Sequence, residues 1–240
     1  MTGILGHLWS PLASTPLLWL MVTLCAYGLG RGAQKACGGA AAANPVMIAI
    51  TLVAMFLLST GTSYRTYFDG AQFIHFLLGP TTVAMAVPLV RNSAYVRRNL
   101  RGIGVALVAG SLTSIVSGVM IVSLCGGSAD VALSMAPKGV TTPIAMAVSG
   151  QIGGVPALTA ALAILGGIVA AVSGQRLLRR LDIEDWRVHG LAAGVAGSGV
   201  AAAQVAARNE LGAAFAALGI GLNGLLTALL APLLAGLFHR

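Results

Sequence analysis

Charged and aromatic residues are scarce in this chain of 240 residues. Only 8% of the residues are charged and 5% are aromatic, whereas 57% are hydrophobic and the mean hydropathy is +0.90. Soluble domains carry about 25% charged residues, so this composition excludes an ordinary soluble domain. No polar block is long enough to form a separate soluble domain either, and we therefore predict a single integral membrane domain over residues 1–240.

Acidic residues and cysteines are also few. There are six Asp and Glu against 14 Lys and Arg, so intramembrane carboxylates for acid–base or metal chemistry are nearly absent. No metalloprotease or Walker motif is present, and we expect neither an enzyme nor a cofactor. Three cysteines without Cys-x-x-Cys spacing predict no disulfide framework. The excess positive charge lies in short clusters without interleaved aromatic residues, a pattern that argues against nucleic-acid binding.

Apolar stretches of near-spanning length recur along the whole chain. They predict an all-α polytopic membrane protein with about seven or eight apolar segments. The segments lie near residues 15–30, 45–60, 71–90, 103–125, 131–152, 155–175, 188–206 and 211–237.

Two basic clusters, at 91–101 and 176–187, constrain how these segments cross. Three crossings between the clusters would put them on opposite sides of the membrane, against the positive-inside rule. The conflict disappears if segment 131–152, which Pro and Gly interrupt, is re-entrant and returns to the side it entered. Both clusters and the C-terminus then face the cytoplasm, and the N-terminus lies outside.

Lys138 is the most informative residue, because it is the only charged residue between Asp130 and Arg176. A charged side chain at the bilayer centre costs about 2.5–3.5 kcal/mol even on lenient insertion scales. Pro137 and Gly139 interrupt any helix here, and broken backbone at membrane depth is tolerated where it lines a cavity. The pattern indicates an anion-binding or water-filled site, the alternative being a lysine that snorkels to the interface.

A motif around this lysine has an echo earlier in the chain. Residues 79–87 and 139–148 both contain Thr-Thr, a nearby proline and Ala-Met-Ala-Val, through common origin or through chance in Ala-rich sequence. Paired interrupted segments in two halves of a chain indicate the midplane site of a secondary transporter. Their threonines could equally bond their own backbone. The substrate-binding residues predicted here are Pro80, Thr81, Thr82, Lys138, Thr141, Thr142 and Pro143.

Several strings make a family resemblance recognisable, above all Pro-Lys-Gly-Val-Thr-Thr-Pro-Ile-Ala at 137–145, with further strings at 76–89, 153–160 and 225–232. From about residue 44 onward, the chain resembles the LrgB/CidB family of antiholin-like proteins, whose plant relative is the plastidial glycolate/glycerate translocator. The resemblance implies transport of small monocarboxylates such as glycolate, glycerate, pyruvate or lactate across a bacterial inner membrane. It also implies discontinuous helices, elevator-type movement and a small LrgA/CidA-like membrane partner. Repeat halves would cover 44–125 and 131–240, with inverted topology.

One string departs from the family pattern. Members of the family carry Ser-His-Gly-Ile-Gly-Thr-Ala-Arg-Ala where this chain has Gly-Ser-Gly-Val-Ala-Ala-Ala-Gln-Val at 197–205. Histidine is replaced by Ser198 and arginine by Gln204, which keep only neutral hydrogen-bonding capacity. Ser198, Gly199 and Gln204 therefore join the predicted substrate site, and Lys138 becomes its main fixed cation.

Two functions remain open from the sequence. The first is a secondary transporter of small monocarboxylates, and the second is a holin/antiholin-like regulator of murein hydrolase export or cell lysis. Small-residue spacings such as that of Gly190 and Gly194 permit close helix contact and suggest a homodimer.

Overall fold

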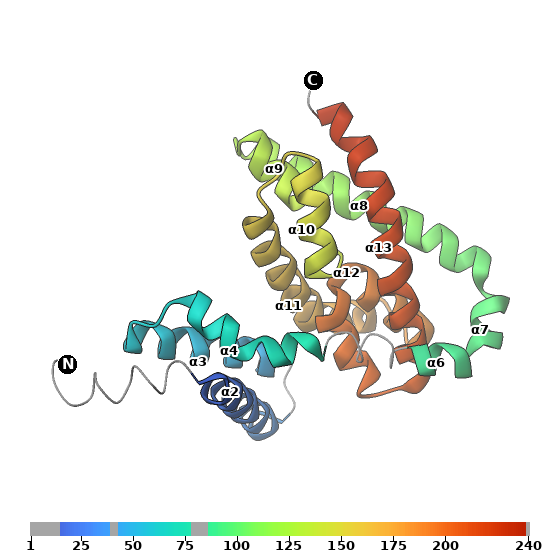
Figure 1. Ribbon diagram of the computed structural model, residues 1–240. Coiled ribbons are helices and arrows are strands. Elements are labelled where there is room, and N and C mark those ends of the chain that lie inside the picture. The colour runs from blue at the N-terminus through green and yellow to red at the C-terminus, as the bar shows by residue number, and fades with distance from the viewer. Residues whose placement is uncertain (1–14, 39–42, 78–85, 239–240) are drawn as a thin grey trace, which may run out of the picture. The chain divides into compact units, whose positions relative to one another are not determined.

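The computed structural model describes residues 15–38, 43–77 and 86–238, and these residues form helices and no strand (Figure 1). The all-α class is thus confirmed for the described residues. The chain divides into two compact units, unit 1 (Met1–Ala84) and unit 2 (Met85–Arg240). The single integral domain and the repeat halves at 44–125 and 131–240 stay predictions.

Unit 1 contains three described helices, and aromatic packing holds them together. Trp19 is fully buried, and its ring makes an edge contact with Tyr67 at a centroid distance of 5.8 Å. The side chain of Asn44 starts the second helix by accepting a hydrogen bond from the Val46 amide at 2.9 Å. The helices are α2 (Pro16–Ala36), α3 (Pro45–Thr60) and α4 (Tyr64–Phe76).

Unit 2 contains the four described helices that are long and apolar enough to cross a membrane. An α-helix rises about 1.5 Å per residue, so about 20 residues span a hydrocarbon core of about 30 Å. The structure thus supports a multi-pass membrane protein, but it does not confirm seven or eight crossings. The four helices are α8 (Leu100–Leu124), α11 (Pro156–Arg180), α12 (Trp186–Ala206) and α13 (Glu210–Phe238), and the shorter helices of unit 2 are α6 (Ala86–Arg91), α7 (Ser93–Arg98), α9 (Ala129–Met135) and α10 (Thr142–Gln151).

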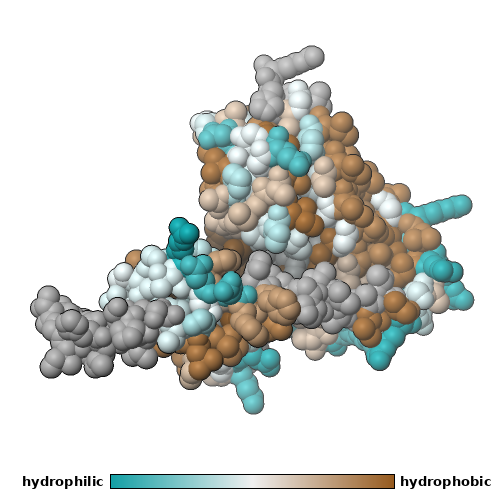
Figure 2. Space-filling view, in the orientation of Figure 1, coloured by the Kyte–Doolittle hydropathy of each residue, from teal (hydrophilic) through white to brown (hydrophobic). Residues whose placement is uncertain are grey.

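In unit 2, the surface over α13 and α8 is largely apolar (Figure 2). On α13, Leu225, Leu229 and Leu233 are all exposed and follow one another at four-residue intervals, so they form a single stripe. In water such a stripe would be unfavourable, whereas lipid chains solvate it without cost. This surface is the one expected of a helix that faces lipid.

Glycine allows α12 and α13 to pack closely. A Cβ atom added to Gly190 would lie 2.2 Å from the Gly212 carbonyl oxygen, and one added to Gly194 would lie 2.4 Å from the Ala216 carbonyl oxygen. Both distances are far below van der Waals contact. The small-residue spacing at these two glycines therefore serves packing within the chain and does not argue for a dimer contact.

Segment 131–152 is broken around Lys138, as its prolines and glycine predict. The backbone leaves helical structure after Met135 and resumes it at Thr142. The chain then folds back, because the Val155 amide donates to Ser134 Oγ at 2.7 Å and Thr159 Oγ1 donates to the Ser134 carbonyl at 3.0 Å. The break in this segment is thus confirmed, and its re-entrant course through a membrane stays a prediction.

We predict that Gly190→Ala destabilises unit 2 by about 1–3 kcal/mol, because the added methyl group overlaps the α13 backbone. Thermal unfolding in detergent, followed by circular dichroism, measures the effect. Gly221→Ala on α13 is the matched control, since a Cβ there meets nothing within 4 Å. Equal melting temperatures for the two variants would contradict the close packing.

Candidate functional site

A cavity of about 700 Å³, here called the Lys138 cavity, lies between α8, α12 and the broken segment. Its lining along α8 runs from Asn99 to Ser117, which corresponds to about 27 Å of helix. The middle of the lining is apolar, while Ser114, Ser117 and Lys138 contribute polar groups. The apolar lining residues include Ile103, Ala106, Leu191, Val195 and Phe215.

The ammonium group of Lys138 is only partly satisfied by the protein. Its Nζ donates to the Ser114 carbonyl oxygen at 2.8 Å, and Ser114 Oγ lies at 3.5 Å. An ammonium has three donors. Among the residues that the structure describes, no acidic side chain forms an ion pair with Lys138. Gly118 leaves room for this group, because a Cβ there would lie 2.6 Å from Nζ.

Asn223 on α13 holds the lysine loop in place. Its Nδ2 donates to the carbonyl oxygens of Gly139, at 3.2 Å, and Val195, at 3.1 Å. The side chain is almost fully buried and joins the broken segment to α12 and α13. Asn223 is not among the site residues predicted from the sequence, although it is the one amide side chain in the apolar stretch 211–238.

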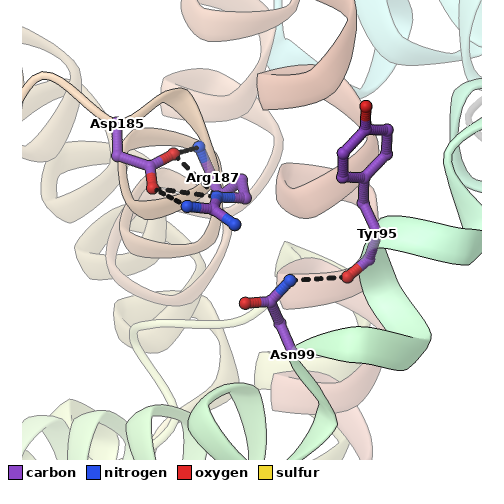
Figure 3. Close-up of polar contacts among 4 residues, drawn as sticks. All are labelled: Tyr95, Asn99, Asp185 and Arg187. Carbon is purple, nitrogen blue, oxygen red and sulfur yellow. Dashed lines mark hydrogen bonds and ion pairs between the residues drawn. The ribbon is translucent and has the colours of Figure 1, made fainter.

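Asp185 and Arg187 form a second polar group in the lining of the Lys138 cavity (Figure 3). Both carboxylate oxygens of Asp185 accept hydrogen bonds from the Arg187 Nε, at 3.0 and 2.8 Å. The Arg187 guanidinium thereby holds the pKa of the Asp185 carboxyl below its ordinary value. Near this pair, Asn99 in the same cavity lining donates through its Nδ2 to the Tyr95 carbonyl at 2.7 Å. Asn99, from the stretch 91–101, and Arg187, from the stretch 176–187, thus line the same cavity. The cytoplasmic orientation of the two basic clusters stays a prediction.

The other predicted site residues are distributed around this cavity rather than in its lining. Thr141 and Thr142 are half-buried at the start of α10, and Pro143 beside them is exposed. None of these three is among the described residues that line the Lys138 cavity. Pro80, Thr81 and Thr82 lie outside the described residues, so their predicted part in the site stays a prediction.

The family-departing string lies in α12 and includes a backbone break. Ser198 has φ 47° and ψ −138°, which is non-helical, and its buried Oγ has no hydrogen-bond partner. Gly199 next to it is exposed. Gln204 does not line the Lys138 cavity but a different one. The structure therefore does not bring Gln204 and Lys138 together in one site.

Gln204 lines a smaller cavity of about 250 Å³ between α11 and α12, here called the His189 cavity. Gln175 and His189 line it too, and in all three residues one buried nitrogen has no hydrogen-bond partner. A buried polar atom left unsatisfied costs about 1–3 kcal/mol. The sequence analysis did not single out Gln175 or His189.

Comparison with known proteins places these features in a family. The sequence model of the LrgB-like family matches residues 23–237. Curated relatives named antiholin-like protein LrgB, from Bacillus mycoides (strain KBAB4) and Bacillus cereus (strain B4264), are each 30% identical over 219 residues. These matches cover 91% of this chain and 95% of each relative. No solved structure matches the chain.

We predict that Asn223→Ala loosens the lysine loop, because two carbonyl oxygens lose their donor at once. The expected loss is about 1–3 kcal/mol of unfolding free energy. Thermal unfolding in detergent measures it against Ser59→Ala, which removes an exposed hydroxyl bonded within its own helix. Similar melting temperatures for both variants would show that Asn223 does not hold the loop.

The Asp185–Arg187 pair predicts a specific pH dependence. Because the folded pKa of Asp185 is lowered, the stabilisation from the pair is complete above the ordinary carboxyl range. It is lost as the pH falls through the lowered pKa. The melting temperature of the native protein should therefore exceed that of Asp185→Asn near neutral pH, with the difference closing only in acid. Glu184→Gln, at an exposed neighbour outside the pair, is the control, and a difference that persists in strong acid would refute the assignment.

Proposed function

This chain belongs to the LrgB-like family, and from the partly satisfied ammonium in its Lys138 cavity we propose that it is a multi-pass membrane protein that binds and transports small monocarboxylates. We propose that the protein lies in the bacterial inner membrane. The Lys138 cavity would open alternately to the two sides of that membrane, by elevator-type or rocking movement.

The charge of the cavity lining carries the proposal. Three described lining residues are charged, namely Lys138, Asp185 and Arg187. Asp185 and Arg187 neutralise each other in a close ion pair, so one positive charge, that of Lys138, remains in excess. A carboxylate would supply the missing negative charge and accept the unused Nζ donors through short, charge-assisted hydrogen bonds.

The surroundings of Lys138 make this binding both strong and reversible. In a low-dielectric site, the Lys138 ammonium and a carboxylate are each energetically unfavourable alone. The ion pair that they form is tolerated while both partners are present. The Ser114 carbonyl stabilises the ammonium when no anion is bound. Ser117, also in the lining, supplies a hydroxyl that a hydroxy acid or its hydration water could engage.

The volume of the cavity indicates a vestibule rather than a tight pocket. About 700 Å³ corresponds to roughly 20 waters at about 30 Å³ each, far more than a two- or three-carbon acid needs. A small acid would therefore reach Lys138 together with water. Charge selects the anion at this site, and finer discrimination requires closer contacts elsewhere.

A second function has more direct support from the comparisons. The relatives from Bacillus mycoides and Bacillus cereus carry the name antiholin-like protein LrgB, which mentions no transported solute. The corresponding proposal is a regulator of murein hydrolase export or cell lysis that moves no specific solute. Saturable, stereoselective uptake distinguishes transport from a lesion, which leaks unrelated solutes of similar size.

Assembly is a further part of the proposal. Small-residue spacings in the sequence suggest a homodimer, and the family resemblance implies a complex with a small LrgA/CidA-like membrane protein. Crosslinking in native membranes tests both assemblies. A homodimer yields one band at twice the subunit mass, whereas a small partner yields a band whose mass exceeds one subunit by less than a second subunit. A pattern that stops at one subunit would refute both assemblies.

We predict that Lys138→Met abolishes saturable counterflow of labelled glycolate, glycerate, pyruvate and lactate in proteoliposomes, because the fixed cation is lost. Lys35→Met is the matched control, since it removes the other lysine of the chain from an exposed position in unit 1. The control should exchange like the native protein. Exchange that survives Lys138→Met would exclude this anion site, and absence of exchange in the native protein would favour the regulatory function.

A further inference from the structure

We infer that the His189 cavity is a second binding site. It binds a small α-hydroxy carboxylate and recognises the hydroxyl group through a hydrogen bond to His189. This inference rests on the proposed function, since it places a selectivity step beyond the Lys138 vestibule. The cavity, of about 250 Å³, lies between α11 and α12 and is close to the size of a small acid with a few waters.

Unsatisfied polar groups are concentrated around this cavity. Five buried side-chain atoms of the described residues lack a hydrogen-bond partner, and three of them belong to residues that line it. They are Gln175 Nε2, His189 Nδ1 and Gln204 Nε2. His189 is only 6% exposed, so its unpartnered nitrogen is buried within the protein. Buried polar groups are normally paired, and a cluster of exceptions around one cavity indicates a ligand site.

The chemistry of two of these atoms follows from their neighbours. His189 Nε2 lies 2.8 Å from the Ile183 carbonyl oxygen, which can only accept, so Nε2 donates and the tautomer with one proton has Nδ1 as an acceptor. Gln175 Oε1 accepts from the Arg208 guanidinium, which can only donate. The Gln175 amide is thereby oriented with Nε2 as a free donor. Gln204 contributes a second amide donor.

Two donors and one acceptor select a particular ligand. The oxygens of a carboxylate accept from the two amide groups, and a neighbouring hydroxyl donates to His189 Nδ1. The positive charge of Arg208, bonded to Gln175, favours an anion here. A keto acid or an unsubstituted acid offers no donor to His189 and leaves the imidazole nitrogen unpaired. Sites built to bond a hydroxyl discriminate against analogues that lack it.

The His189 cavity adjoins the Lys138 cavity across α12. Ala192 and Ala196 are in the lining of both, so only small side chains separate the two spaces there. The non-helical Ser198 lies two residues beyond Ala196 and interrupts the same helix. A modest rearrangement of α12 at this break would connect the two cavities. The order of events is then anion capture at Lys138 followed by recognition of the hydroxyl at His189.

Trp186 provides a local reporter for this site, because its ring centroid lies 5.4 Å from that of His189. The experiment titrates purified protein in detergent with lactate, propionate and pyruvate and records tryptophan fluorescence. Trp186→Phe identifies the part of the signal that comes from Trp186. We expect lactate to bind about tenfold more tightly than propionate or pyruvate, as one added hydrogen bond allows. In His189→Phe the lactate affinity should fall to the propionate value.

Cavity-filling variants separate the two sites. Ala193 lines only the His189 cavity and Ala106 only the Lys138 cavity. Ala193→Leu should therefore remove the Trp186 response, while Ala106→Leu should retain it. His189→Gln serves as a second variant, because its amide can still donate to the Ile183 carbonyl and keep the helix start intact. Circular dichroism checks that each variant is folded.

Lys138→Met distinguishes failure of this inference from failure of the proposed function. If the inference holds, Lys138→Met loses counterflow but keeps the lactate response of Trp186. Loss of that response in Lys138→Met would show a single site at Lys138 and overturn the second site alone. Native protein without counterflow but with His189-dependent lactate binding would overturn transport and keep the site. Equal responses to lactate and propionate, or no response, would overturn the inference.

Discussion

The hydrogen bond from Lys138 Nζ to the Ser114 carbonyl is the contact around which unit 2 is organised. A bilayer offers no water to a charge or to broken backbone, so both must be satisfied by protein or by a cavity. The loop that carries Lys138 meets this constraint through Ser114 on one side and Asn223 on the other. The ammonium has no acidic partner among the described residues. In the function proposed above, a bound carboxylate supplies the missing negative charge.

Small side chains make this arrangement possible. Gly118 leaves space for the ammonium, and Gly139 lets the lysine loop approach α12. Gly190 and Gly194 bring the backbones of α12 and α13 together. Alanines separate the two cavities where bulky residues would close them. In a membrane, helices gain little free energy from burying apolar surface against each other. Close backbone packing and interhelical hydrogen bonds therefore stabilise the association of the helices.

The two cavities differ in size and in the groups that line them. The Lys138 cavity is the larger, and the charge of Lys138 is the one in its described lining that no ion pair balances. The His189 cavity is smaller, and Gln175, His189 and Gln204 in its lining each have a buried nitrogen without a hydrogen-bond partner. In the functions proposed above, the first cavity attracts anions by charge, and the second distinguishes ligands by their hydrogen-bonding groups.

Composition alone determined that this is a helical membrane protein, because the scarcity of charge is a property of every segment. Pro137 and Gly139 also determined the break at Lys138, since their effects on the backbone are local. The tertiary structure decided which distant residues meet. Asn223 bonds Gly139 across 84 positions of sequence, and Gln204, predicted beside Lys138, lies with His189 in another cavity. Such pairings depend on how helices rotate and cross, and an apolar segment with little periodicity does not reveal which of its faces points inward.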